Sequence, residues 1–398
     1  MSKEKTSYRG VCKIIKDNGY TCYECSYYIV IDGIKKRKFK SGFKTAKEAN
    51  AFRNDMIKKS SVGEYVEPTK KTVKTFIEEW LPSIKNSISY KTYKQYQYIA
   101  YTRVIPALGD KKLQQLNKLD VNKFLNDDIA LNTGKKLSST TLRHYYGFLN
   151  RMLKAALENG YVIKNIMETI TAPKINKKEI RVLDEVQLKS LLEALKNYSV
   201  YDCAFISANT GMRLGEVLGL TWNKIDFKNN CLYVTHQLQY INGTFKLTKL
   251  KTRSSQRKIV LNKLLYHALK DIKQKQFENK SMLQEVYNND LNLVITQNNG
   301  KPYSVEYVSR NFRRVISECN YKDNKSIIDY YNMPKLSFHD LRHTFATLML
   351  KANVNPKVVS EILGHSTVAM TLDTYSHLLP SMQNEAMNKF NNLLEVTN

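Results

Sequence analysis

Two short polar segments that contain proline divide the chain and limit how many residues can share one hydrophobic core. The first runs from Val66 to Lys71 and the second from Thr171 to Glu179, and both are basic, as linkers often are. The chain has 398 residues, which is enough for two or three domains of about 100–200 residues each. We therefore predict three domains, over residues 1–70, 71–175 and 179–398.

The charge balance indicates a polyanionic partner. The sequence has 63 Lys and Arg against 36 Asp and Glu, a formal net charge of +27. Such an excess is typical of proteins that bind nucleic acid, and less often of proteins at an anionic membrane surface. A second interpretation stays open, because 49 of the 63 basic residues are lysine, as in proteins from AT-rich genomes.

The remaining composition fits a globular protein in the cytoplasm. Hydrophobic residues make up 42% of the chain and charged residues 25%, which is ordinary for folded domains. We find neither a signal peptide nor an apolar run of the roughly 18 residues that a membrane helix needs. The six scattered cysteines are expected to be free thiols. A cytosolic protein that faces DNA or RNA is the prediction at this point.

Residues 1–70 have the pattern of a small sheet with one helix. Aromatic and β-branched residues predict strands over 20–23, 26–31 and 35–39, with Asp32-Gly33 as a hairpin turn. Thr45 and Glu48 form a capping-box pattern for a helix that extends to about Lys59. The prediction is a three-stranded sheet backed by a helix.

The returning strand of this sheet is strongly basic. Residues 33–47 hold seven basic side chains and no acid, and a sheet with a basic face can bind in a DNA groove. A solvated edge strand rich in lysine is the alternative. The candidate DNA contacts here are Lys35, Lys36, Arg37, Lys38 and Lys40.

Residues 71–175 are predicted to be helical. Helices are expected over 73–81, 90–104 and 118–131, and from Ser138-Ser139 to Asn159-Gly160, where capping residues flank an apolar periodicity. Tyrosines at helical spacing after residue 90 are mostly core residues. Lys91 and Lys94, on the other face, are candidate phosphate contacts.

Metal and nucleotide sites are not indicated. Cys12, Cys22 and Cys25 are three thiols without a fourth soft ligand nearby, since the first histidine is His144. The P-loop pattern GxxxxGK[ST] does not occur, so the sequence gives no sign of an ATPase. We expect no metal and no cofactor.

The C-terminal segment instead contains an ordered series of basic and polar residues. Arg213 lies where one helix breaks at Gly211 and another begins, and Glu216 one turn later can hold its guanidinium. His339 and Arg342 are spaced to share one helical face. The series in full is Arg213, Lys251 near the tip of a turn between strands, His339, Arg342, His365 after a glycine, and Tyr375.

Each of these residues alone has an ordinary structural explanation, but together they fit attack on a phosphodiester without a metal. Two arginines can neutralise the non-bridging oxygens of a pentacoordinate phosphate, and histidines can donate hydrogen bonds to them. A tyrosine hydroxyl can be the nucleophile and form a phosphotyrosine. A lysine can protonate the 5′ oxygen that leaves.

The series resembles the tyrosine recombinases, a family that includes phage and transposon integrases and Xer-type resolvases. The motifs TGMRLGE (210–216), HDLRH (339–343) and LGH (363–365) and Tyr375 match in order and spacing over roughly residues 75–398. The resemblance implies that Arg213 and Arg342 bind phosphate, that Lys251 is the lysine of a β-hairpin, and that Tyr375 is the nucleophile. It also implies that His339 and His365 are the active-site histidines and that Glu216 supports Arg213.

The resemblance further implies a multidomain α+β fold. This fold has an arm-type DNA-binding domain (1–70) with a three-stranded sheet and a helix, a helical core-binding domain (71–175), and a mostly helical mixed α/β catalytic domain (179–398). An amphipathic helix over 381–398 would dock either on a neighbouring protomer or on the protomer to which it belongs. The arm domain is similar to those of conjugative-transposon integrases and favours an integrase over a Xer-type resolvase.

The activity implied is site-specific integration and excision of a mobile element. The partners implied are duplex DNA at crossover and arm-type sites, three further copies of the chain in a tetramer on a Holliday junction, and an accessory excision or DNA-bending protein. No membrane partner is expected, and the location would be the cytoplasm, at the bacterial nucleoid. The alternatives are a Xer-like resolvase, a type IB topoisomerase-like strand transferase and a non-catalytic DNA-binding regulator.

Overall fold

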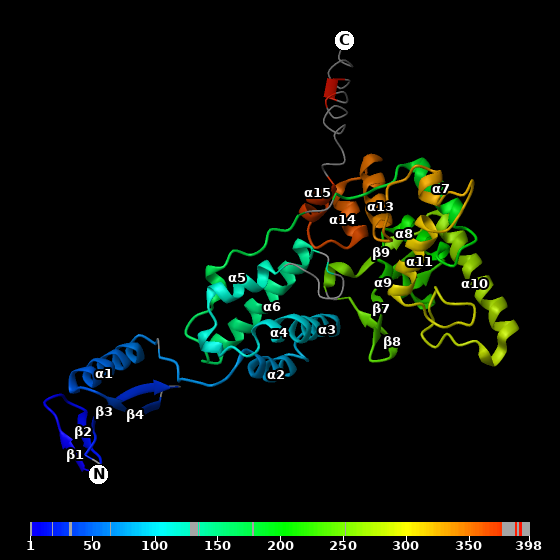
Figure 1. Cartoon of the computed structure of the whole chain (residues 1–398). Helices are drawn as coiled ribbons and strands as arrows, with labels where there is room; N and C mark the ends of the chain where they lie inside the picture. Colours follow the sequence, from blue (N-terminus) through cyan, green and yellow to red (C-terminus); the bar gives the residue numbers. More distant parts are fainter. Residues whose placement is uncertain are drawn as a thin grey trace. The chain divides into compact units, whose positions relative to one another are not determined.

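The computed structural model describes residues 2–17, 19–31, 34–63, 65–127, 134, 136–176, 179–250, 252–375, 387, 390 and 391. The chain divides into two compact units at residues 177 and 178 (Figure 1). Several predictions lie outside the described residues: the turn at 32–33, Lys251 and, apart from residues 387, 390 and 391, the helix over 381–398. The helix predicted over 118–131 ends earlier, at Asn126, and Asp127 is its C-cap.

The first unit begins with an antiparallel sheet of four strands in the order β1-β2-β3-β4. The strands are β1 (Ser2–Lys5), β2 (Val11–Ile15), β3 (Thr21–Ile31) and β4 (Ile34–Phe43). Helix α1 (Ala46–Ser61) packs on β3, and its predicted cap is present, since Thr45 Oγ1 accepts a hydrogen bond from the Glu48 backbone N–H.

The prediction of three strands was wrong for a physical reason. Neither β1 nor β2 was predicted. β1 is exposed along its whole length and has no apolar alternation to reveal it, whereas β2 has only five residues, of which Val11 and Ile14 are buried. The strands predicted at 20–23 and 26–31 are one strand, β3. Glu24, which separated them in the sequence, lies within β3 and forms an ion pair with Lys3 of β1 at 2.5 Å.

The rest of the first unit is helical and has its own hydrophobic core. The predicted helix over 90–104 continues through a π-helical turn (Ala100–Val104) into α4, and Ser138 caps α6 as expected. The elements are α2 (Val73–Ser83), α3 (Tyr90–Ile99), α4 (Ile105–Leu108), a 3-10 helix (Leu113–Gln115), α5 (Lys118–Asn126), α6 (Ser139–Glu158) and a 3-10 helix (Ile166–Thr169).

The second unit is mostly helical, with two small sheets. Its helices are α7 (Glu185–Leu195), α8 (Tyr201–Thr210), α9 (Leu214–Leu218), α10 (Lys263–Leu283), α11 (Val305–Ser317), α12 (Ile327–Tyr330), α13 (Asp340–Lys351), α14 (Pro356–Leu363) and α15 (Val368–Tyr375). Three-residue 3-10 helices lie at Trp222–Lys224, Arg253–Ser255 and Gln284–Val286. The described strands are β5 (Ile225–Asp226), β6 (Cys231–Val234), β7 (His236–Ile241), β8 (Thr244–Lys249) and β9 (Arg257–Val260).

The strands on either side of Lys251 belong to different sheets, so they are not the two strands of one hairpin. β8 pairs with β7, whereas β9 pairs with β6 in the three-stranded sheet β5-β6-β9. The sequence indicated two strands with a turn between them, but pairing partners are not encoded by local pattern. β8 and β9 therefore lie in different sheets although they follow one another in the chain.

Two glycines end the helices that lead into the site. Gly211 follows α8 with φ of 64°, and Gly364 follows α14 with φ of 69°. Both values lie in the left-handed region that favours glycine. A Cβ on Gly211 would also come within 2.6 Å of Phe345 Cδ1 and 2.7 Å of Leu363 Cδ2. The turn that presents Arg213 thus needs a glycine for both conformation and space.

We expect Gly211→Ala to destabilise the second unit by about 2–4 kcal/mol, from left-handed strain plus overpacking. The control is Gly215→Ala in α9, where a Cβ would lie 3.7 Å from Gln237 and φ is not positive. This control should leave the free energy of unfolding unchanged or raise it by up to about 1 kcal/mol. Urea denaturation of both variants measures the difference. Equal stabilities would contradict the packing argument.

Candidate active site

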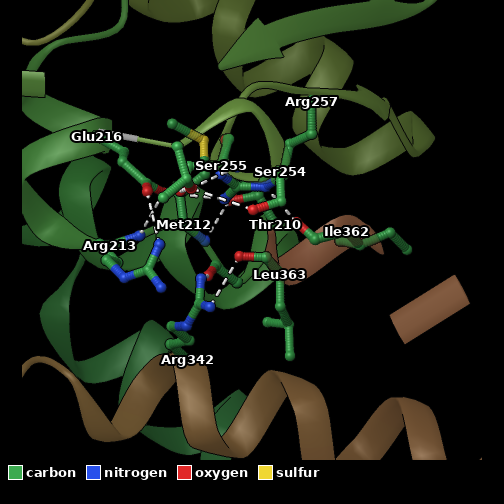
Figure 2. Close-up of polar contacts among 12 residues, drawn as sticks. Thr210, Met212, Arg213, Glu216, Ser254, Ser255, Arg257, Arg342, Ile362 and Leu363 are labelled. Atoms are coloured by element: carbon green, nitrogen blue, oxygen red, sulfur yellow. Dashed lines mark hydrogen bonds and ion pairs between the residues drawn. The ribbon is translucent and has the colours of Figure 1, made fainter. Parts of the chain in front are cut away.

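A buried carboxylate holds two arginines at the start of α9. Glu216 is 2% exposed, and its Oε1 accepts from Arg213 Nη1 at 2.9 Å while its Oε2 accepts from Arg257 Nη2 at 2.9 Å. Oε2 also accepts from the backbone N–H of Arg213 at 3.0 Å. Figure 2 shows this network. The predicted pair of Arg213 and Glu216 is present, and Arg257 joins it.

Opposing effects set the pKa of Glu216. Burial alone would raise the pKa of Glu216, but Arg257 and Arg213 outweigh it and hold the pKa below its ordinary value. The Glu216 carboxylate is therefore charged at neutral pH. Arg257, with 5% of its side chain exposed, also donates through Nε to Ile362 O and through Nη1 to Ser255 O at 3.0 Å. Arg257 thus links the β8–β9 connection to the end of α14.

Arg342 is fixed by two main-chain carbonyls. This residue of α13 is 2% exposed, and its Nη1 donates to Gly211 O at 2.7 Å. Its Nη2 donates to Leu363 O at 2.8 Å (Figure 2). Burial lowers the pKa of Arg342 to about 9, and the positive charge of Arg213 adds to that effect. Arg342 stays protonated at neutral pH and lies within electrostatic reach of Arg213.

The hydroxyl of Tyr375 contacts a histidine of α13. Tyr375 ends α15 with 1% of its surface exposed, and its Oη lies 2.8 Å from His343 Nδ1. His339 is the N-cap residue of α13, and its ring meets the ring of His343 edge-on with centroids 4.8 Å apart. Burial raises the pKa of Tyr375 to about 12, although Arg342 and Arg213 act in the opposite direction. The hydroxyl is protonated in the resting site.

The histidines of the site are uncharged near neutral pH. Burial lowers the pKa of His339 to about 4, aided by His343 and Arg342, and lowers that of His365 to about 4, aided by Arg342 and Arg213. His365 Nδ1 lies 2.8 Å from Thr371 Oγ1. When the Thr371 hydroxyl donates to Nδ1, the single ring hydrogen of neutral His365 is on Nε2, where it can be donated to an anion.

The structure thus brings together five of the six predicted catalytic residues with Glu216, while Lys251 lies outside the described residues. Arginines held at fixed positions beside neutral N–H donors and a tyrosine hydroxyl suit binding of a phosphodiester and in-line attack on it. Within the part of the chain that the structure describes, no group of three or more His, Cys, Asp or Glu side chains is arranged to hold a metal ion.

Sequence reasoning missed two residues of the site. Arg257 stood among several basic residues near Lys251, and no local pattern could connect it to Glu216, 41 residues earlier. His343 was part of a quoted motif without a role. Its spacing of four residues from His339 places both on one helical face, and that signal was available.

The predicted DNA contacts of the first unit divide between two faces of the sheet. In register, Lys36, Lys38 and Lys40 lie opposite Ile29, Tyr27 and Cys25, three β3 residues that pack against α1. Residues directly opposite one another share a face. Lys38 forms an ion pair with Glu67, and Lys40 lies over the Phe52 ring at 4.2 Å. Only Lys35 and Arg37 lie on the face away from α1.

This open face, which we define as Tyr28, Lys35, Arg37 and Phe39, combines charge with exposed aromatic rings. Arg37 donates to Ser26 Oγ at 3.1 Å, and its guanidinium lies over Phe39 at 5.0 Å. Lys35 lies over Tyr28 at 4.9 Å.

In the helical part, Lys91 and Lys94 are exposed on α3. No helix among the described residues has the length and apolarity to cross a membrane.

Comparison with known sequences gives three matches to family patterns. Residues 181–382 match the phage integrase family, residues 72–127 match the SAM-like N-terminal domain of phage integrases, and residues 13–60 match an arm DNA-binding domain. A relative named tyrosine recombinase XerC-like, from Caldanaerobacter subterraneus subsp. tengcongensis, is 26% identical over 88% of this chain and 90% of that protein.

Solved structures show the same fold. The Tn1549 transposon integrase bound to circular intermediate DNA superposes with a TM-score of 0.66 at 22% identity, over 80% of this chain and 99% of that one. A lambda integrase tetramer bound to a Holliday junction gives a TM-score of 0.56 at 17% identity, over 94% of this chain and 96% of that one. The predicted fold class is confirmed, with four strands in the N-terminal sheet in place of three.

We expect Glu216→Gln to destabilise the second unit by about 3–5 kcal/mol, because it leaves the buried guanidinium of Arg257 without a counter-charge. The matched control is Glu193→Gln, whose ion pair with Lys196 is exposed and should contribute nothing measurable. Chemical denaturation, followed through a signal of the second unit, gives the free energy of unfolding of both variants. If Glu216→Gln is as stable as the control, the buried ion pairs do not hold the site together.

Proposed function

The chain belongs to the phage integrase family and is a site-specific DNA recombinase of the tyrosine type, and on that premise we propose that it cuts and rejoins DNA through Tyr375 to integrate and excise a mobile element. The observation that carries the proposal is the meeting of Arg213, Arg342 and His365 near the hydroxyl of Tyr375 in one cluster. A crossover phosphodiester is the anion that this cluster would bind.

The proposed chemistry is transfer of the crossover phosphoryl group to Tyr375 and back to DNA. Oη of Tyr375 attacks phosphorus, a bond from Oη to phosphorus forms, and the bond to the 5′ oxygen breaks. Arg213 and Arg342 stabilise the extra negative charge on the non-bridging oxygens, and His339 and His365 donate hydrogen bonds to them. The energy of the phosphodiester is kept in the phosphotyrosine, so rejoining needs no ATP. Attack by a 5′ hydroxyl of the partner strand reverses the step and gives a Holliday junction.

Lys251 is proposed as the general acid that protonates the leaving 5′ oxygen. The described neighbours support this: β8 ends at Lys249, and Arg257 at the start of β9 is tied to the site through Glu216 and Ile362. A lysine between these two strands is close in sequence to a fixed element of the site. Protonation of an alkoxide leaving group contributes about 10²–10⁴-fold in rate.

We propose that residues 1–70 bind arm-type DNA through the open face of the sheet, and that residues 71–175 bind the crossover site, with Lys91 and Lys94 as phosphate contacts. The match to an arm DNA-binding domain supports the first assignment. The separate hydrophobic cores of the sheet and of the helical part support a boundary near residue 70, with the catalytic domain over 179–398.

A tetramer on DNA is part of the proposal. The lambda integrase structure with the same fold is a tetramer on a Holliday junction, and strand exchange between two sites needs four cuts. The amphipathic segment over 381–398 is proposed to dock between protomers. We also propose that an accessory excision or DNA-bending protein takes part. Because the substrate would be chromosomal DNA, the proposed location is the bacterial nucleoid in the cytoplasm.

We expect Tyr375→Phe to bind crossover DNA with wild-type affinity and to form no covalent adduct, because only the attacking oxygen is removed. A nicked suicide duplex that carries the joined element ends traps the adduct of the wild type, which is seen as a slower band on a denaturing gel. Tyr331→Phe, which also removes a hydroxyl in the second unit, is the control and should keep the adduct. An adduct formed by Tyr375→Phe would disprove the assignment, and no adduct from the wild type on any element-end DNA would disprove the function.

We expect Arg37→Ala to weaken binding to arm-type DNA by about 5- to 150-fold, the scale of one base or phosphate contact in a groove. Lys36→Ala removes the same charge from the adjacent position on the other face and should cost much less. Titrations by fluorescence anisotropy at two salt concentrations separate the two. Equal losses would mean that total charge, and not the open face, determines binding.

A further inference from the structure

The hydroxyl of Tyr375 has one hydrogen-bond partner among the described residues, and it is not one of the two histidines that the motif assigns to the phosphate. His343 Nδ1 lies 2.8 Å from Tyr375 Oη, and the two ring centroids are 5.6 Å apart. His339 contacts the His343 ring and makes no described hydrogen bond to Tyr375. The Tyr375 hydroxyl is therefore held by the α13 residue that directly follows Arg342.

His343 also faces a route to solvent. Together with Asp340 and Ser337 it lines a cavity of about 1070 Å³ that carries the basic side chains of Arg181, Arg313 and Lys335 on its walls. Asp340 Oδ2 accepts hydrogen bonds from the backbone N–H of Ser337 at 2.6 Å and from Ser337 Oγ at 2.8 Å. A carboxylate fixed in this way, three residues before His343 on the same helix, stabilises a positive charge on the imidazole.

Building on the function proposed above, we propose that His343 is a catalytic residue that orients Tyr375 and takes its proton during attack. The proton moves from Tyr375 Oη to His343 Nδ1, Oη bonds to phosphorus, and the bond to the 5′ oxygen breaks. The 5′ oxygen receives its proton from a different group, proposed above as Lys251. His343 then returns the proton to Oη when the phosphotyrosine is resolved.

The protonation states of the resting site are compatible with this transfer. Burial lowers the pKa of His343, and Asp340 acts in the opposite direction while Arg342 adds to the lowering. The other titratable groups around its ring are His339, His365 and the Tyr375 hydroxyl itself. A neutral imidazole thus faces a protonated phenol at neutral pH, which is the arrangement that a general base needs before the reaction.

The test measures single-turnover adduct formation on the crossover duplex with which the wild type reacts, so the proposed function is established before the variant is examined. We expect His343→Gln to slow the adduct by about 10²-fold or more, because glutamine can accept the tyrosine hydrogen bond but cannot take the proton. His267→Gln, an exposed histidine of α10, is the matched control and should react as the wild type does. Melting temperature and DNA affinity check that His343→Gln is folded.

Two rescue experiments separate proton transfer from a structural role. A fluorinated tyrosine at position 375, with a more acidic hydroxyl, should restore most of the rate that His343→Gln loses. A bridging 5′ sulfur, which leaves without a proton, should not restore it, although it should restore a Lys251→Ala variant. The proposal is overturned if His343→Gln reacts at nearly the wild-type rate, or if its defect persists with the fluorinated tyrosine. It is also overturned if His339→Gln, and not His343→Gln, is rescued by the acidic tyrosine.

Discussion

The site depends on one buried carboxylate. Glu216 lies between Arg213 and Arg257, and a carboxylate in this position is unfavourable unless it is paired and hydrogen-bonded. Its two partners come from the start of α9 and the start of β9, which are 44 residues apart, and Arg257 extends the network to the end of α14 through Ile362 O. The ion pairs of Glu216 hold the start of α9 to the start of β9. The hydrogen bond from Arg257 to Ile362 O adds the end of α14 to this group. Ion pairs and a hydrogen bond between distant elements thus help to position the residues that we propose to bind phosphate.

The part of this arrangement that a sequence can predict is the local part. Arg213 and Glu216 are three residues apart at a helix start, and His339 and Arg342 share a turn, so spacing alone placed each pair. The contacts between distant elements were out of reach, because a carbonyl acceptor has no sequence signal. Arg342 donates to Gly211 O and Leu363 O, and any residue at those positions would present the same oxygen. The same limit explains why Arg257 was not distinguished from its basic neighbours.

The N-terminal sheet shows a second limit, which concerns faces and pairing. A run of basic residues in a strand indicates charge, but the two-residue period places neighbours on opposite faces. Only the register with β3 shows that Arg37 lies with Tyr28, while Lys36 lies with Ile29 beside α1. β1 was missed because an exposed strand paired only through its backbone lacks the apolar alternation that identifies strands. β2 was missed as well, because its five residues bury only Val11 and Ile14 and do not alternate strictly between apolar and polar.

The two arginines that we propose to bind phosphate divide their donors differently, and this fits different tasks. A guanidinium has five N–H groups. Arg342 is 2% exposed and uses two of these N–H groups on Gly211 O and Leu363 O. Its remaining N–H groups are therefore held in a fixed and desolvated position, where a hydrogen bond to an anion is strong. Arg213 uses one side-chain N–H on Glu216 and keeps 41% of its side chain exposed. In the proposed reaction an incoming phosphate therefore meets Arg213 first, and Arg342 would provide the buried, preorganised charge that stabilises the transition state more than the ground state.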